Sequence, residues 1–378
     1  MKFGFKTNLW LYAIKKKKEK RMNRITKFLA LALVFFIAVS ALVFAGGQQE
    51  KGEDAKIVVK YSDSDPPGGV RTAFLADYFL PEIEKQTAGQ IELQDFWGGA
   101  LLGPPEALKG IKDGITDIGF LFPEFFPEQL PLHQIFKLFP VGPGSWKAQR
   151  WIYENAYAEI PELKAELAKW NQMPLLMTAG LPGTFTSSYK VDSIDDLDGK
   201  KWRASSRWLL GYLKSAGAIP VSVPWADCYM ALQTGTVDGV LANLDGIHMT
   251  KQDEAAGHIF VAKEMWWATP FLHNVNLDFW NSLPEDVQQE ILQAAENAKD
   301  AYAEAYDNAF DEIIATQEAN GIEVEIASPE QIANWQEVSQ AEKLQQQWVE
   351  EAKEAGYDNA QEIMDKMREI VKQGLEMD

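Results

Sequence analysis

The sequence predicts an α/β protein built from two lobes, and three features support this prediction. Short segments expected to form strands alternate with helical segments from residue 56 onward, which is typical of mostly parallel sheets covered on both faces by helices. The roughly 330 residues after an apolar leader exceed what one hydrophobic core usually supports. A long helical segment from Ser282 to about Asn320 is expected to bridge the lobes, although a solvated surface helix is the alternative interpretation.

Residues 1–45 have the composition of a cleavable secretory signal. The basic stretch Lys15–Arg21 precedes an almost unbroken apolar run, Phe28–Ala45, whose end suits a signal peptidase. An uncleaved membrane anchor is the alternative, because the run is close to the minimum spanning length. Met22 opens a complete signal by itself, so it is a second candidate start. We therefore expect a periplasmic protein that begins near Gly46.

Charge and cysteine content limit the partners and the covalent cross-links that the protein can have. Ten of the 36 basic residues and one of the 55 acidic residues lie in residues 1–45, which leaves 26 basic and 54 acidic residues and a net charge of −28. Such a chain is repelled by nucleic acid and by anionic lipid, so neither is an expected partner. The single cysteine, Cys228, excludes an internal disulfide.

The expected elements follow one another in a regular order. Residues 46–55 are polar and Gly-rich and are expected to form a flexible leader. In the first half we expect strands over 56–61, 90–96 and 115–121, a loop over 62–69 and helices over 71–86 and 105–112. Further on we expect strands near 175–179, 200–204, 237–242 and 321–326, with helices between them and a helix opened by Ser328.

One local pattern occurs twice in the chain. Ala107-Leu108-Lys109 leads to a glycine and then to Asp117, and Ala231-Leu232-Gln233 leads to a glycine and then to Asp238. Both patterns predict a helix, a glycine at its end and an aspartate at the entry to a strand. We expect one such unit in each lobe, and a ligand site between the lobes at the carboxyl ends of the strands.

We assign the chain to the lobes as follows. Residues 56–180 and 273–310 are expected to form lobe I, and residues 181–272 and 311–345 to form lobe II. Helices over 346–378 complete the chain, and we expect this end to pack mainly against lobe II.

The central segment carries a family resemblance. Asp195-Asp196-Leu197-Asp198-Gly199-Lys200-Lys201-Trp202-Arg203, and then Gly217 to Gly239 with its Pro224-Trp225-Ala226-Asp227 turn, resemble the central motif of TRAP-type solute-binding proteins of the DctP class. Weaker landmarks on both sides extend the resemblance over nearly the whole chain after the leader. The resemblance implies the two-lobed periplasmic solute-binding protein fold. It also implies a receptor that captures a small organic carboxylate and delivers it to a two-part membrane permease.

The resemblance also implies ligand-binding residues. Arg203 matches the arginine that forms a two-pronged salt bridge with the substrate carboxylate, as a planar guanidinium can; a surface arginine is the alternative. Trp225 is expected to lie over the ligand or in the core, and Asn243 to supply an amide. Ser206 is expected to make a polar contact or to cap a helix. Residues 183–188 lack the second arginine of some members, which argues against highly charged sugar acids.

Aromatic residues suggest the character of the ligand. Phe120 and Phe122 come after Asp117, at the end of the lobe I strand and just beyond it, and five tryptophans crowd lobe II. Such residues usually belong to the core, but we expect some to face the cleft. One arginine and many rings would suit a monocarboxylate with an apolar or aromatic body.

Enzyme signatures are missing from the sequence. The four histidines form no zinc-binding spacing, and neither a nucleophile elbow nor a nucleotide-binding glycine loop is present. We therefore expect a monomeric binding protein without catalysis, cofactor or metal. A ligand-presenting subunit of a sensor is the main alternative, and an enzyme on the same fold is a less favoured one.

Overall fold

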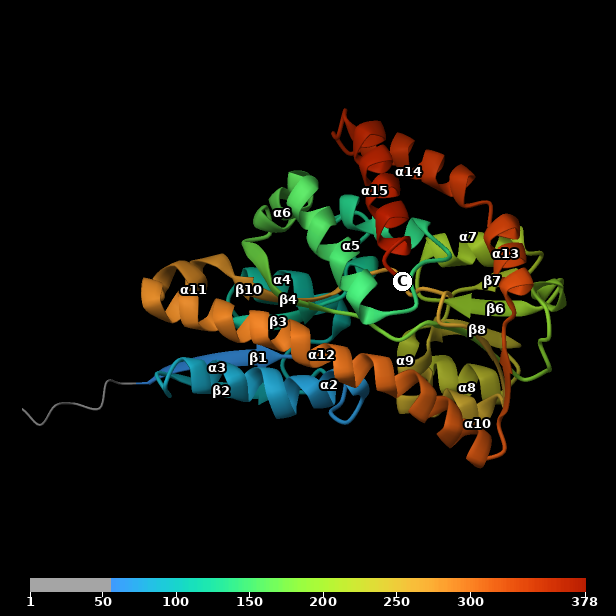
Figure 1. Ribbon diagram of the computed structural model, residues 1–378, viewed down its shortest axis with the longest axis horizontal. Helices are drawn as coiled ribbons and strands as arrows, with labels where there is room; N and C mark the ends of the chain where they lie inside the picture. The colour runs from blue at the N-terminus through green and yellow to red at the C-terminus, as the bar shows by residue number, and fades with distance from the viewer. Residues whose placement is uncertain (1–55) are drawn as a thin grey trace, which may run out of the picture. The chain divides into compact units, whose positions relative to one another are not determined.

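The chain folds around two β-sheets, as a computed structural model of residues 56–378 shows (Figure 1). The first sheet, in the order β2-β1-β3-β10-β4, contains β1 (Ile57–Ser62), β2 (Ile91–Phe96), β3 (Ile118–Leu121), β4 (Gln172–Thr178) and β10 (Phe271–Asn276). The second sheet, in the order β11-β9-β5-β8-β6-β7, contains β5 (Gly183–Ser187), β6 (Lys201–Ala204), β7 (Ile219–Val221), β8 (Gly239–Asn243), β9 (His258–Val261) and β11 (Glu323–Ile326). The predicted two-lobed α/β fold is confirmed, while the expected signal and leader lie outside the described residues.

Each sheet is parallel apart from one strand. In the first sheet β10 runs antiparallel to β3 and β4, and in the second sheet β5 runs antiparallel to β8 and β9. The chain crosses between the sheets three times: β5 and β10 follow the first two crossings, and β11, which is parallel to β9, follows the third. The expected mostly parallel sheets are thus observed, with one reversed strand in each sheet.

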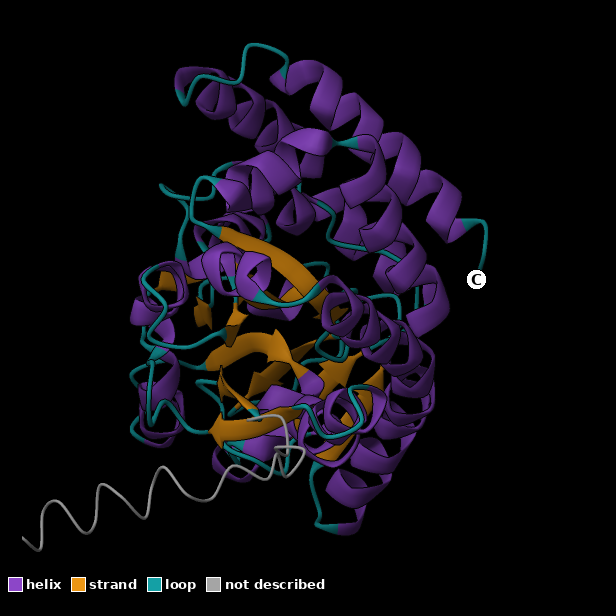
Figure 2. Ribbon diagram, turned by 90° about the vertical axis from the view of Figure 1, so that its left-hand side faces the viewer, coloured by secondary structure: helices purple, strands orange, loops and turns teal. Residues whose placement is uncertain are grey.

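Helices surround the strands, as Figure 2 shows. The helices and single turns of the first half are α2 (Val70–Phe74), η1 (Leu75–Phe79), α3 (Leu80–Gln86), η2 (Pro104–Glu106), α4 (Ala107–Lys112), η3 (Pro123–Phe125), η4 (Leu132–Leu138), α5 (Trp146–Glu159) and α6 (Pro161–Ala168). Those of the second half are η5 (Ile194–Leu197), α7 (Arg207–Ser215), η6 (Trp225–Asp227), α8 (Cys228–Gln233), α9 (Leu244–Met249), α10 (Gln252–Ala255), α11 (Leu277–Ser282), α12 (Glu285–Ala319), α13 (Pro329–Val338), α14 (Ala341–Glu354) and α15 (Ala360–Leu375). Within residues 56–378, no helix is both long and apolar enough to cross a bilayer.

The repeated pattern forms the same local structure in both lobes. The glycines after α4 and α8 have φ values of +70° and +69°, which glycine adopts without strain. The carboxylate of Asp117 then accepts a hydrogen bond of 2.8 Å from the backbone N–H of Lys60 on β1. Asp238 accepts one of 2.8 Å from the backbone N–H of Lys201 on β6. Each aspartate therefore ties the start of its own strand to the neighbouring strand.

The long helix α12 bridges the lobes, as predicted. It contacts α3 and β4 in the first lobe and α9 and β11 in the second. Its buried face repeats every four residues, which gives a continuous apolar stripe made of Ala294, Ala298, Tyr302, Tyr306 and Phe310. The hydroxyl of Tyr302 donates a 2.7 Å hydrogen bond to the carbonyl of Ala179, where the chain passes from β4 to β5. The helix therefore supports the connection between the lobes.

The end of the chain packs differently from the prediction. The last helix, α15, lies along α5 in the first lobe (Figure 1), and only α13 and α14 reach the second lobe. Gly374 of α15 lies so close to Ile152 of α5 that a Cβ would meet its side chain at 2.3 Å. The side chain of Asp378 accepts hydrogen bonds from the backbone N–H groups of Gly144 and Ser145 at the start of α5. The amphipathic pattern of α15 predicts a buried face but does not identify the helix that covers it.

Candidate ligand-binding cleft

A cavity lies between the two sheets, at the carboxyl ends of β1, β3, β6 and β8. It contains about 770 Å³ of space, part of it open to solvent. Its walls come from both halves of the fold and consist of Ser64, Asp65, Gly69, Val70, Arg71, Thr72, Pro104, Phe120, Phe122, Phe125, Arg203, Ser205, Trp225, Ala242, Asn243, Asp245, Gly246, Met249, Trp267 and Phe271. This is the position at which α/β sheets bind ligands, and we refer to the cavity as the cleft.

Arg203 is a buried cation without an anionic partner among the described residues. It lies near the carboxyl end of β6 and is 3% exposed. Its Nε donates a 3.0 Å hydrogen bond to the carbonyl of Val223, while its Nη1 is buried without a hydrogen-bond partner in this part of the chain. Burial lowers the pKa of the Arg203 guanidinium. The Val223 bond orients the guanidinium and leaves the two Nη groups available to an anion.

Aromatic rings form much of the wall around this cation. The indole of Trp225 lies 5.4 Å from the Arg203 guanidinium carbon, within the range of a cation–π contact. Phe271 packs edge to face against both Phe120 and Phe122, with ring centroids 5.6 and 5.1 Å apart. Such packing holds the rings in place, so the cleft has a fixed apolar wall.

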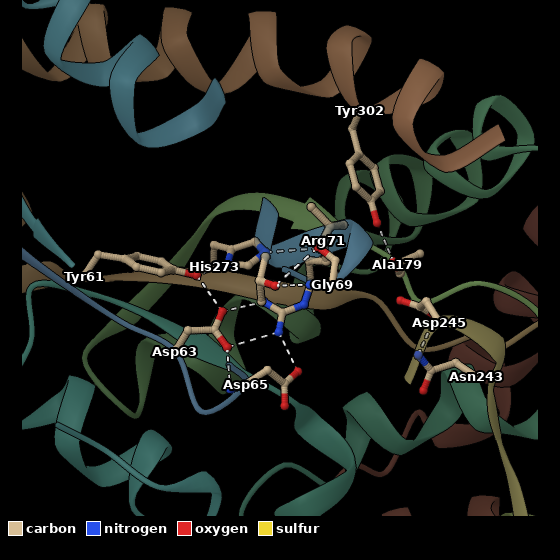
Figure 3. A network of polar contacts seen from close by, with 12 residues as sticks. Tyr61, Asp63, Asp65, Gly69, Arg71, Ala179, Asn243, Asp245, His273 and Tyr302 are labelled. Carbon is tan, nitrogen blue, oxygen red and sulfur yellow. Dashed lines mark hydrogen bonds and ion pairs between the residues drawn. The ribbon is translucent and has the colours of Figure 1, made fainter. Parts of the chain in front are cut away.

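A second arginine, Arg71 of α2, also lines the cleft, but carboxylates neutralise it (Figure 3). Its Nη1 and Nη2 bind both oxygens of Asp63 at 2.5 and 3.0 Å, and its Nη2 also binds Asp65 at 2.6 Å. Burial acts to raise the pKa of Asp63, but Arg71 outweighs it and holds that pKa below its usual value. Phe120 covers the guanidinium, with its ring centroid 3.9 Å away.

A buried chain of hydrogen bonds fixes Asp63 from behind (Figure 3). The hydroxyl of Tyr61 donates to Asp63 at 2.8 Å and lies 3.1 Å from Nδ1 of His273, whose Nε2 lies 3.0 Å from the hydroxyl of Thr178. Burial lowers the pKa of His273 to about 3, so the ring is neutral at pH 7. With the proton of His273 on Nδ1, Thr178, His273 and Tyr61 each donate one hydrogen bond along this series. The series fixes Asp63, and Asp63 in turn fixes Arg71.

A corner of the second lobe contributes a further carboxylate. Asn243, the last residue of β8, donates from Nδ2 to Oδ1 of Asp245 at 2.6 Å. The same oxygen accepts a 2.9 Å hydrogen bond from the backbone N–H of Leu181. Burial raises the pKa of Asp245, and no ion pair within residues 56–378 includes it.

One polar contact joins the two lobes beside the cleft. Ser205, which follows β6, donates a 2.7 Å hydrogen bond to Glu124 after β3. Glu124 also accepts from Thr269 at 3.0 Å and pairs with Lys137 at 2.8 Å. The side chains of Glu124 and Lys137 are both 1% exposed. Glu124 is therefore held in place by Lys137 of the first lobe and by Thr269, which lies just before β10.

The structure places five of the six predicted site residues around the cleft: Phe120, Phe122, Arg203, Trp225 and Asn243. Ser206 does not line it. Its hydroxyl instead accepts from the backbone N–H of Leu209 and caps α7, which was the alternative interpretation. Ser205 takes the position in the wall, because it lies two residues after Arg203 and therefore on the same face.

Three charged wall residues were missed by the sequence analysis: Asp65, Arg71 and Asp245. The positions of Asp65 shortly after β1 and of Asp245 shortly after β8 were an available signal, since ligands bind at the carboxyl ends of strands, whereas Arg71 lies within α2. In the part of the chain that the structure describes, no group of three or more histidine, cysteine, aspartate or glutamate side chains is arranged to hold a metal ion.

Comparison with known proteins places this architecture in a family. The profile of bacterial extracellular solute-binding protein family 7, DctP, matches residues 67–351. The ectoine-binding periplasmic protein TeaA of Halomonas elongata is 25% identical over 324 residues, which cover 83% of this chain and 89% of TeaA. The C4-dicarboxylate-binding periplasmic protein DctP of Rhodobacter capsulatus is 27% identical over 299 residues, which cover 75% of this chain and 84% of that protein.

A solved structure agrees with the same fold. The TRAP periplasmic solute-binding protein from Desulfovibrio salexigens with bound orotic acid superposes with a TM-score of 0.74 at 18% identity, over 84% of this chain and all of that one. The family match covers most of the chain and includes every residue of the cleft wall except Ser64 and Asp65. The chain is therefore a member of bacterial extracellular solute-binding protein family 7, and it is a TRAP solute-binding protein of the DctP-like type.

Proposed function

We propose that this protein captures a small organic monocarboxylate between its lobes and delivers it unchanged to the membrane permease of a TRAP uptake system. Arg203 is the observation that carries the proposal. A buried guanidinium without a counter-charge is costly to fold, and an anionic ligand would remove that cost. In a closed cleft of low dielectric constant, this pairing would discriminate strongly against uncharged solutes.

The count of available cations supports one carboxylate rather than two. Arg71 and Arg203 are the basic residues in the described wall of the cleft, and Arg71 is already paired with Asp63 and Asp65. A dicarboxylate would therefore bury one negative charge without a partner. The protein as a whole is also acidic, so long-range attraction does not favour anions and a local cation must hold the ligand.

The aromatic part of the cleft wall favours a ligand whose remainder, beyond the carboxylate, is apolar or ring-shaped. Trp225 is proposed to cover the carboxylate from above Arg203, and Phe120 and Phe122 to pack against the body of the ligand. Asn243 is proposed to make a polar contact at the opposite corner. The relative TeaA is described as an ectoine-binding protein, and ectoine is a compact ring with one carboxylate, which is in line with this cleft.

Ser205 and Glu124 are proposed to hold the lobes together once the ligand is enclosed. Their hydrogen bond joins the strand end that carries Arg203 to the first lobe. At the other side of the cleft, a Cβ on Gly69 would lie 2.7 Å from the sulfur of Met249, so the lobes also approach closely there. A ligand that favours this arrangement would shift the population toward it.

A thermal-shift screen followed by calorimetric titration tests the proposal. Monocarboxylates, dicarboxylates and the primary amide of each monocarboxylate would be compared, since the amide keeps the shape and removes the charge. A monocarboxylate at 1,000 times its Kd should stabilise the protein by about 4 kcal/mol, whereas its amide should have little effect. Recovery of the bound acid chemically unchanged would support binding without catalysis. Equal binding of acid and amide, or conversion of the acid, would contradict the proposal.

A further inference from the structure

Two carboxylates that line the cleft, Asp65 and Asp245, each have one oxygen without a hydrogen-bond partner among the described residues. Asp65, from the loop after β1, has a side chain that is 28% exposed. Its Oδ2 binds Arg71 at 2.6 Å, whereas its Oδ1 accepts no hydrogen bond from the described residues. Asp245, at the start of α9, uses Oδ1 for Leu181 and Asn243, and its Oδ2 accepts none within residues 56–378.

The charges around the cleft do not balance when it is empty. Arg71 carries one positive charge against the two carboxylates of Asp63 and Asp65, so this group keeps one excess negative charge. Asp245 adds a second excess negative charge. Arg203 is the excess positive charge. A ligand that brought only a carboxylate would satisfy Arg203 and would leave both excess negative charges enclosed with it.

The two carboxylates line the same cavity, and burial affects both in the same way. Figure 3 shows Asp65 against the Arg71 guanidinium and Asp245 apart from it, beside Asn243, on a segment of the other lobe. Burial raises the pKa of Asp65, and the charge of Asp63 and, to a smaller extent, that of Asp245 raise it further. Burial also raises the pKa of Asp245. A positively charged group placed beside them would relieve both effects.

We infer that the captured monocarboxylate is an amino or imino acid, whose cationic nitrogen is bound by Asp65 and Asp245 while its carboxylate is bound by Arg203. This inference rests on the proposed function and narrows its ligand class. The unpaired, buried Arg203 sets the position of the anionic end, and the free oxygens of the two aspartates set the position of the cationic end. Each end then forms charge-assisted hydrogen bonds with a fixed partner. The aromatic wall would contact the apolar part of the ligand.

Matched pairs of ligands test the inference directly. Each pair joins an amino or imino acid to the acid of the same shape without nitrogen: alanine and propionate, proline and cyclopentanecarboxylate, phenylalanine and 3-phenylpropionate. Thermal shift selects the pairs that bind, and calorimetric titration gives both Kd values. We expect at least one pair in which the nitrogen-containing member binds ten times more tightly or better.

Substitutions assign that preference to the cleft. Asp65→Asn and Asp245→Asn should each reduce the ratio of the two Kd values toward one, with circular dichroism confirming that both variants fold. Asp300→Asn is the matched control, because Asp300 is exposed on α12 and pairs with Arg150. It should leave the ratio unchanged.

The possible outcomes separate this inference from the proposed function. Tighter or equal binding of the nitrogen-free acids would overturn the inference but leave carboxylate capture by Arg203 intact. A nitrogen preference that survives in both asparagine variants would also overturn it. Absence of binding by every acid in the panel would count against the proposed function, and the inference would fail with it.

Discussion

Replacement of Arg203 is expected to affect ligand binding far more than it affects folding. Arg203→Ala removes both the charge and the planar fork, and Arg203→Lys keeps the charge but offers a compact ammonium instead. The Nε of Arg203 already binds the carbonyl of Val223 at 3.0 Å, so the two Nη groups are the donors that remain for a carboxylate. The structure therefore predicts that one side chain provides the two-pronged contact.

The expected magnitude follows from the burial of this residue. At 3% exposure, removal of Arg203 would leave the ligand carboxylate unpaired in a closed cleft, which should cost about 3–5 kcal/mol of binding. This corresponds to a Kd that is weaker by about 10²- to 10⁴-fold. Arg203→Lys should lose one charge-assisted hydrogen bond and cost about 1.5–3 kcal/mol.

The ligand-free protein should respond differently. Burial lowers the pKa of Arg203, which means that the environment disfavours its charge when no anion is present. Arg203→Met keeps much of the volume and removes the charge, so we expect the Tm of the ligand-free protein to stay unchanged or to rise. A substantial fall in Tm would show that Arg203 has a structural partner in the empty cleft.

Calorimetric titration with the best monocarboxylate from the screen measures these effects. Arg207→Ala is the matched control, because Arg207 lies four positions further along the chain and pairs with Glu351 on the surface. It should bind as the wild type does. If Arg203→Ala binds within about threefold of the wild type, the carboxylate is held elsewhere and the site assignment is wrong.

The structure leads to other expected outcomes. Asp245→Asn should raise the Tm of the ligand-free protein at pH 7, because burial raises the pKa of Asp245 and its ionised form destabilises the fold. This gain in Tm should disappear below about pH 4, where the carboxyl group is protonated in both the folded and the unfolded protein. A lower Tm of the variant at pH 7 would contradict this. Gly239→Ala should lower the free energy of unfolding by about 1–3 kcal/mol in chemical denaturation, because a Cβ would lie 2.5 Å from the ring of Trp202. Gly257→Ala, where nothing lies within 4 Å, should be nearly neutral, and equal effects would refute the packing argument. The intact mass of the exported protein should correspond to a start near Gly46, whereas a product that keeps residues 28–45 would indicate an anchored protein.

The fold was predictable where local signals determine it. Short runs between turn residues predicted most strands, and the repeated helix, glycine and aspartate pattern predicted one equivalent unit in each lobe. The same pattern did not reveal that Asp117 and Asp238 bind the backbone of a neighbouring strand, because that contact depends on the order of strands in the sheet. The covering of α5 by α15 was missed for a related reason, since an amphipathic helix does not specify its partner.

The candidate site was predictable only in part. Arg203 and Trp225 came from a motif that is continuous in the sequence, and the structure places both in the wall of the cleft. Arg71 and Asp245 are separated from Arg203 by more than one element, and only the sheet order brings them together. Ser206 and Ser205 differ by one position, and the start of α7 decides which of them faces the cleft. The sequence therefore predicted the residue that binds the ligand's carboxylate but missed the charged residues Asp65, Arg71 and Asp245 in the same wall.

Mass spectrometry of the small molecules released from the purified, denatured protein tests the central claim most directly. The account predicts that wild-type protein from the native periplasm releases one organic monocarboxylate in an amount close to one per chain. Protein with Arg203→Ala, prepared in the same way, should release little or none of it. Release of a neutral solute, or of equal amounts of the same acid from both proteins, would contradict capture of a carboxylate by Arg203.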